Sequence, residues 1–90
     1  MDDQRDAEPE IVVDRRSAHD HAHELQRRIE DLAERIADSE DLVAAAYEES
    51  ARLRPHEAER LRENARQARE YAERERTFAR DSAAARHSES

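Results

Sequence analysis

The 90-residue chain contains no glycine, no cysteine and no tryptophan, and its aromatic residues are two tyrosines and one phenylalanine. Without cysteine the chain cannot form disulfides or thiolate zinc sites. Without glycine, hairpin-rich β folds and glycine-rich phosphate loops are disfavoured, because both need backbone angles that glycine adopts most easily. These absences leave a helical protein without a nucleotide loop as the main expectation.

The chain also lacks an apolar run near the roughly 20 residues of a membrane span, and no basic-then-apolar signal peptide opens it. We therefore expect a cytoplasmic protein. All basic residues are arginine, which together with abundant alanine suggests a GC-rich bacterial genome. The formal net charge of −8 argues against direct nucleic-acid binding, since phosphates demand a positive surface.

What the sequence does contain is one apolar stripe on three- and four-residue steps. At about 100° per residue, this spacing places its members within about 40° of one another on a helix. Its members are Leu25, Ile29, Leu32, Ile36, Val43 and Tyr47. The stripe predicts a helix over 17–53 that starts at a capping box, Ser17 to Asp20, and stops before Pro55.

A second helix is expected over 55–86, with Pro55 in its first turn. Its stripe is narrower and mostly alanine, and includes Leu61, Ala65, Ala68 and Ala72. We predict an all-α fold in which the stripes of the two long antiparallel helices form the helix-packing interface of a hairpin, in the manner of a coiled coil. One kinked helix of about 70 residues is the alternative.

The ends of the chain lack helical periodicity. Residues 1–16 carry six acids and are expected to form a disordered acidic tail, within which Ile11, Val12 and Val13 make a short apolar patch. That patch is either a segment that lies on the helices or a docking peptide for a partner's sheet. Residues 87–90 are expected to fray.

Few large apolar side chains are available for a core, so self-association is expected. The simplest form is a homodimer that makes a four-helix bundle. Four large side chains lie off the centres of the two stripes and are predicted to flank a second protomer or partner: Leu42, Leu53, Tyr71 and Phe78.

Histidines give the only suggestion of a metal site. His19 and His23 are four residues apart and share a helix face, whereas His21 points away from them. No second cluster supplies further ligands, so a solvated first turn or a pH-sensitive helix start is the preferred interpretation. The sequence holds no catalytic constellation, so we predict no enzyme activity, no metal and no cofactor.

The remaining function is binding. We predict a small acidic, non-enzymatic protein–protein interaction module, an adaptor or regulatory subunit that acts through coiled-coil faces. Residues 1–50 carry sixteen acids and six arginines, a net charge of −10. Glu30, Asp31, Glu34 and Asp38 are therefore the candidate acidic face for a basic partner. The alternatives are a self-assembling scaffold and an acidic nucleic-acid mimic that inhibits a basic partner.

Overall fold

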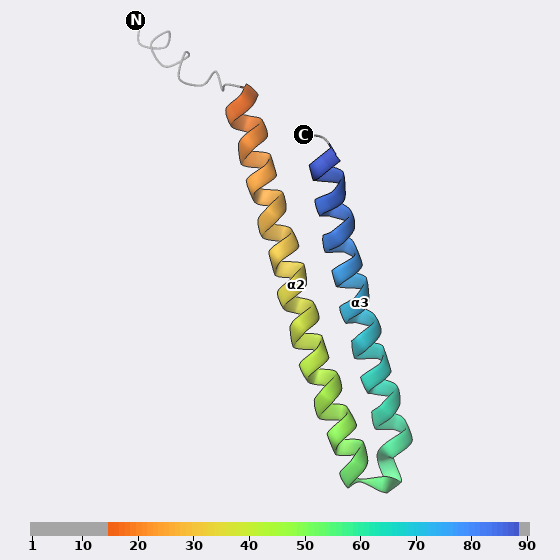
Figure 1. The fold of residues 1–90 in the computed structure, drawn as a ribbon. Coiled ribbons are helices and arrows are strands. Elements are labelled where there is room, and N and C mark those ends of the chain that lie inside the picture. The colour runs from red at the N-terminus through yellow and green to blue at the C-terminus, as the bar shows by residue number, and fades with distance from the viewer. Residues whose placement is uncertain (1–14, 89–90) are drawn as a thin grey trace, which may run out of the picture.

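The computed structural model describes residues 15–88, which form a long antiparallel helical hairpin (Figure 1). Helix α2 spans Arg15–Leu53, a short 3-10 helix η1 spans Pro55–Glu57, and helix α3 spans Ala58–Ser88. Arg54 is the one non-helical residue in this range, which contains no strand. The predicted all-α hairpin is confirmed, and the single kinked helix is wrong. The predictions for the acidic tail concern residues that lie mostly outside the described range.

The two ends of the helical pair differ slightly from the sequence prediction. Helix α2 already includes Arg15 and Arg16, so Ser17 lies inside the helix and the predicted capping box is not used there. Both arginines are good helix formers, so extending the helix over them costs little free energy. Helix α3 continues to Ser88, so the predicted fraying does not begin at His87.

The turn is built by the residues on either side of Pro55. Arg54 adopts φ −128° and ψ 80°, outside the helical region, as expected for a residue before proline. Its amide donates to the Ser50 carbonyl at 2.9 Å, and the Glu57 amide donates to the Arg54 carbonyl at 2.9 Å. Pro55 begins η1, where the missing amide proton has no cost. A tight reversal without glycine results.

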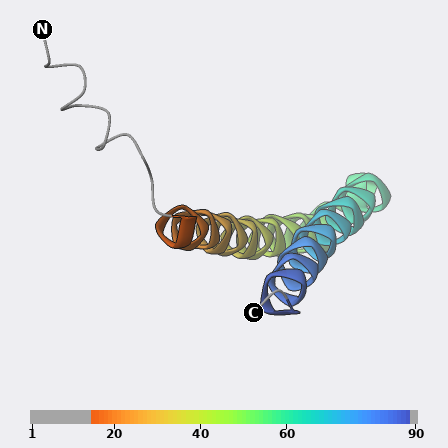
Figure 2. The same cartoon turned by 90° about the horizontal axis from the view of Figure 1, so that it is seen from above.

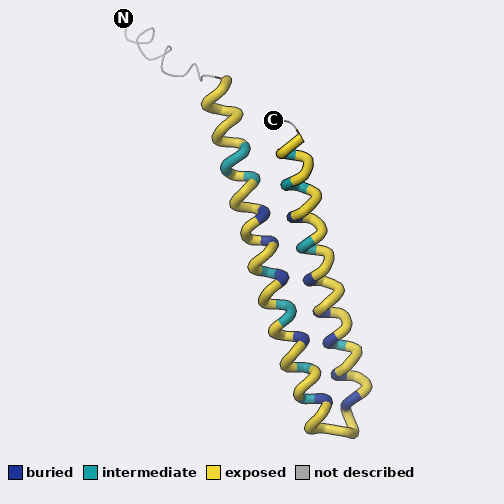
Figure 3. The backbone as a smooth tube through the Cα atoms, viewed as in Figure 1, coloured by how far each residue is buried: buried dark blue, intermediate teal, exposed yellow. Residues whose placement is uncertain are grey.

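The interior of the hairpin is mainly two rows of alanines, one on each helix. In Figure 3 the buried residues are the dark blue segments on the sides of the two helices that face each other. Small side chains let the helices approach closely, and Figures 1 and 2 show that the two helices are inclined to each other. The buried apolar residues are Ala33, Ala37, Ala44 and Ala51 on α2, and Ala58, Leu61, Ala65, Ala68, Ala72 and Ala79 on α3.

The residues expected at the helix-packing interface are buried on α3 but mostly exposed on α2. On α3, the predicted residues Leu61, Ala65, Ala68 and Ala72 are buried. On α2, the prediction is wrong for the contact within the hairpin, because four stripe members remain 42–55% exposed: Leu25, Ile29, Leu32 and Val43. Ile36 is intermediate, and Tyr47 packs partly against the alanine clusters. The alanine row and the stripe lie about 80–90° apart around α2, and the small residues face α3.

Candidate interaction surfaces

Most of the large apolar side chains that are not buried between the helices lie on one side of the hairpin. Val43 and Tyr47 of α2 line a shallow groove together with Tyr71 of α3, so the α2 stripe and Tyr71 are on the same side. Phe78 follows Tyr71 by seven residues, about two helical turns, and therefore shares its direction. We call this surface the apolar face and define it as Leu25, Ile29, Leu32, Ile36, Val43, Tyr71 and Phe78.

Two of the four predicted flanking residues do not belong to the apolar face. Tyr71 and Phe78 are 42% and 45% exposed on it, whereas Leu42 and Leu53 are 73% and 63% exposed elsewhere. Ala44 follows Val43 and faces α3, while Leu42 precedes Val43. At about 100° per residue, Leu42 is turned about 160–200° from Ala44, onto the outer side of α2. The sequence correctly places these residues off the stripe, but not on one common surface.

The opposite side of the hairpin carries ion pairs between the helices. Arg69 contacts Glu48 at 2.7 Å and Asp41 at 3.4 Å, and Arg76 contacts Asp38 at 2.8 Å and Asp41 at 2.9 Å. The hydrogen bond from Arg69 lowers the pKa of Glu48. Exposed pairs of this kind contribute little stability individually. They do fix which residues of α2 and α3 stand at the same height.

A buried carboxylate marks the open end of the hairpin. Glu30 is only 6% exposed, and it accepts a hydrogen bond from Ser82 Oγ at 2.8 Å. Arg86 donates to the same carboxylate through Nε at 3.3 Å and through Nη2, while the side chain of Gln26 donates to Ser82. The hydrogen bond from Arg86 is the largest cause that lowers the pKa of Glu30 below its ordinary value of 4.5. These contacts hold α3 against α2 near the chain ends.

The predicted acidic partner face is divided by these contacts. Glu30 is buried against Arg86, and Asp38 is paired with Arg76. Asp31 and Glu34 are exposed. At about 100° per residue, the four carboxylates lie within an arc of about 100° of the helix circumference. Within the hairpin, Asp31 and Glu34 of the candidate acidic face are therefore left exposed, while Glu30 and Asp38 are engaged by arginines of α3.

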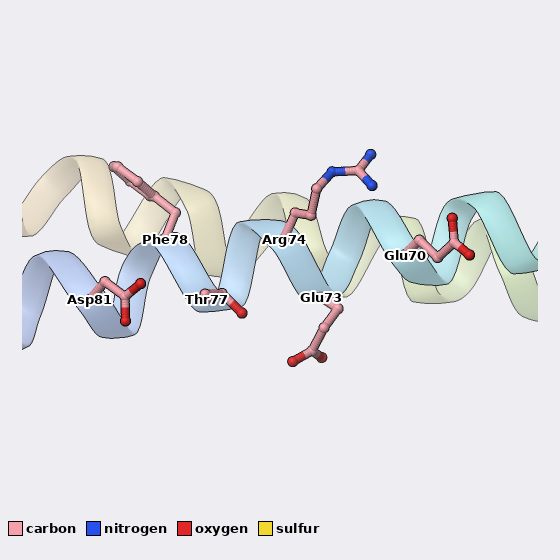
Figure 4. Close-up of a pocket in the computed structure, with 6 residues that line it drawn as sticks. All are labelled: Glu70, Glu73, Arg74, Thr77, Phe78 and Asp81. Carbon is pink, nitrogen blue, oxygen red and sulfur yellow. The ribbon is translucent and has the colours of Figure 1, made fainter.

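The histidine cluster and the α3 groove show no catalytic arrangement. The rings of His19 and His23 lie 4.2 Å apart between centroids, and residues 15–88 contain no group of three or more potential metal ligands. A shallow groove along α3 is lined by both acidic and apolar side chains (Figure 4). Phe78 and Arg74 extend to one side of the helix and Glu73 to the other. The Arg74 guanidinium also lies over the Tyr71 ring, 5.7 Å from its centroid.

Comparisons with known proteins give no family for this chain. No family model matches it, and neither a curated protein nor a solved structure matches it. Within the described helices, none is long and apolar enough to cross a membrane. Among the surfaces of the described hairpin, the apolar face is the most unusual, because it exposes large apolar side chains on both helices.

Proposed function

We propose that this chain is a non-enzymatic helical protein–protein interaction module, an adaptor or regulatory subunit that binds through its apolar face. The observation that carries the proposal is the exposure of this face: six of its seven members are 42–55% exposed in the isolated hairpin. Contiguous apolar surfaces on soluble proteins commonly mark sites of protein association. The three- and four-residue spacing of its α2 members is the spacing of a helix-packing seam.

A second copy of the chain is the simplest partner for this surface. Two hairpins that meet through their apolar faces form a four-helix bundle, an arrangement that buries the faces of both protomers. A self-assembling scaffold would use the same contact without any other partner. The nucleic-acid mimic has less support, because Glu30 and Asp38 are engaged within the hairpin.

The proposal is tested by changing the apolar face without changing helix propensity. Leu32→Gln combined with Phe78→Gln removes two large side chains from the face, and glutamine is nearly as good a helix former as leucine. Leu42→Gln on the outer side of α2 is the matched control. We expect self-association, or capture of a stoichiometric partner from the native host, to be lost in the double variant and kept in the control.

Circular dichroism must show equal helix content in all three proteins, so that loss of binding reports on the surface and not on folding. The proposal fails if the unmodified chain is a helical monomer at every concentration and captures no partner. It also fails if the double variant binds as well as the unmodified chain.

A further inference from the structure

We propose that the chain's own residues 1–14 cover the open-end half of the apolar face, lying along α2 with their carboxylates against Arg28 and Arg35. This segment lies outside the residues that the structure describes. The inference rests on the proposed function and adds a segment of the same chain that competes with the partner for this surface. The open-end half of the face consists of the α2 members nearest the chain ends, Leu25, Ile29, Leu32 and Ile36.

The outer border of this half-face is positively charged. Arg28 and Arg35 line a groove together with Leu32 and Asp31. At about 100° per residue, both arginines lie about 75–95° from the centre of the α2 stripe, on the side away from α3. Among the described residues, Arg28 pairs with Glu24 at 3.3 Å, and Arg35 makes no ion pair. The border therefore favours an anionic occupant.

The acids of α2 leave this half of the face open to such an occupant. Helix α2 carries ten acids, and at about 100° per residue nine of them lie more than about 90° from the centre of the stripe. The exception is Glu40, which follows Ile36 toward the turn. On α3, Asp81 lies beside Phe78 in the α3 groove. An anionic segment is therefore placed along α2, next to the arginines, and not over Phe78.

Residues 1–14 have the complementary composition. They carry six acids and one arginine, a net charge of −5. The same segment holds the apolar patch of Ile11, Val12 and Val13. A segment with both kinds of side chain matches a surface that is apolar along its centre and basic along its border.

The segment is also long enough to reach both arginines. It joins α2 at Arg15, and at about 1.5 Å per residue Arg28 lies about 20 Å and Arg35 about 30 Å farther along the helix. With about two residues in the reversal, an extended chain that rises about 3.3 Å per residue brings Glu8 about 17 Å and Asp3 about 33 Å along α2. Glu8 therefore comes to the height of Arg28, and Asp3 to the height of Arg35.

The apolar patch lies beside small residues in this placement. The same reversal brings Ile11 about 7 Å along the helix, between Ala18 and Ala22. These two alanines continue the α2 stripe toward the start of the helix, and both are exposed. The covalent link holds the segment near the face at an effective concentration in the millimolar range, so a weak contact is enough to populate the covered state.

A pair of spin labels measures the placement directly. The chain has no cysteine, so Gln4→Cys and His56→Cys in the exposed η1 give two specific labelling sites. With the segment on the face, residue 4 lies about 30 Å along α2, and the two labels are about 30 Å apart. With the segment away from the face, the distances are broadly distributed around about 60 Å.

Double electron–electron resonance on labelled chain, diluted in an excess of unlabelled chain, should give the distance of about 30 Å. A broad distribution around about 60 Å would overturn the proposal. A short distance that disappears on dilution would also overturn it, because the segment would then lie on a different copy of the chain. Circular dichroism must show that the labelled chain keeps its helix content.

Removal of the two border arginines tests the charge argument. Arg28→Gln with Arg35→Gln should lower the ratio of the short-distance to the long-distance population about five-fold, because two exposed ion pairs are lost. Arg62→Gln with Arg66→Gln is the matched control. Arg62 makes no ion pair among the described residues, and Arg66 pairs with Glu63 within its own helix, so the control also removes one unpaired and one paired arginine. Equal populations in the two variants would overturn the placement along the arginine border.

Association gives a readout that separates this inference from the proposed function. Asp3→Asn with Glu8→Gln should strengthen association through the apolar face about three-fold, because the competing segment is held less tightly. Glu59→Gln with Glu70→Gln makes the same change in net charge on exposed positions of α3 and should have no such effect. Equal association of the two variants would overturn the competition.

The two proposals fail in different ways. Labels about 60 Å apart, together with association that Leu32→Gln with Phe78→Gln abolishes, overturn the covering segment and leave the proposed function standing. Labels about 30 Å apart in a chain that associates with nothing support the covering segment and refute the proposed function.

Discussion

The sharpest consequence of the structure is that two leucines ten residues apart on the same helix should behave differently. Leu32 lies on the apolar face and is 55% exposed, whereas Leu42 lies on the outer side of α2 and is 73% exposed. We predict that Leu32→Gln weakens self-association and that Leu42→Gln does not. Both changes remove the same side chain and introduce the same residue, so each is a control for the other.

The expected magnitude follows from the exposed fraction of Leu32. Complete burial of a leucine stabilises by about 2 kcal/mol, and about half of this side chain is still exposed in the isolated hairpin. Covering it in a dimer is then worth about 1 kcal/mol per protomer and about 2 kcal/mol per dimer. The dissociation constant should rise about 30-fold in Leu32→Gln.

Sedimentation velocity over a dilution series measures this constant for the three proteins, and circular dichroism confirms that each remains helical. The unmodified chain and Leu42→Gln should give the same dissociation constant within experimental error. Equal weakening by the two changes would show that association uses the outer side of α2 as well. No change in Leu32→Gln would refute the assignment of the apolar face as the contact surface.

Three further predictions concern the hairpin itself. Ala72→Leu places a large side chain into the closely packed interior and should lower the free energy of unfolding by about 1–3 kcal/mol in a urea titration, whereas Ala84→Leu on the exposed surface should be nearly neutral. Arg86→Ala leaves the buried Glu30 carboxylate without its main partner and should lower the thermal midpoint by several degrees, while the same change at exposed Arg80 should not. The pKa of Glu30 is lower in the folded state, so its ion pair stabilises the hairpin above about pH 4.5 and this stabilisation is lost as the pH falls through the folded pKa. The thermal midpoint should therefore be constant between pH 5 and 7 and should fall below about pH 4.5. A midpoint that does not change down to pH 3 would contradict the role of this carboxylate.

Much of this architecture is readable from the sequence because a few residues impose it locally. Pro55 restricts Arg54 and removes an amide proton, so the position of the reversal follows from covalent geometry. The alanine row of α3 was predictable since no competing large apolar stripe lies on that helix. Its members Ala65, Ala68 and Ala72 are buried as expected.

The face of α2 that meets α3 was not predictable from hydrophobic periodicity alone. Two stripes run along α2, and the interpretation favoured the one with the larger side chains. The second stripe, Ala33, Ala37, Ala44 and Ala51, has the same type of spacing and became the interior because small side chains allow both helices to approach closely. Gln26 and Glu30 continue that stripe with polar groups, and only the tertiary contact with Ser82 and Arg86 satisfies them.

The alanine row of α2 faces α3 and the stripe of larger side chains faces outward, and this arrangement links the fold to the proposed function. An alanine interior holds two helices close together but removes little apolar area from water, so it stabilises the hairpin weakly. The larger side chains of Leu25, Ile29 and Leu32 contribute fully only when another surface covers them. These side chains stabilise the folded hairpin fully only when a partner covers them, and they also form the contact with that partner. Folding and binding should therefore be coupled in this protein. A partner that covers the apolar face then also determines how stable the hairpin is.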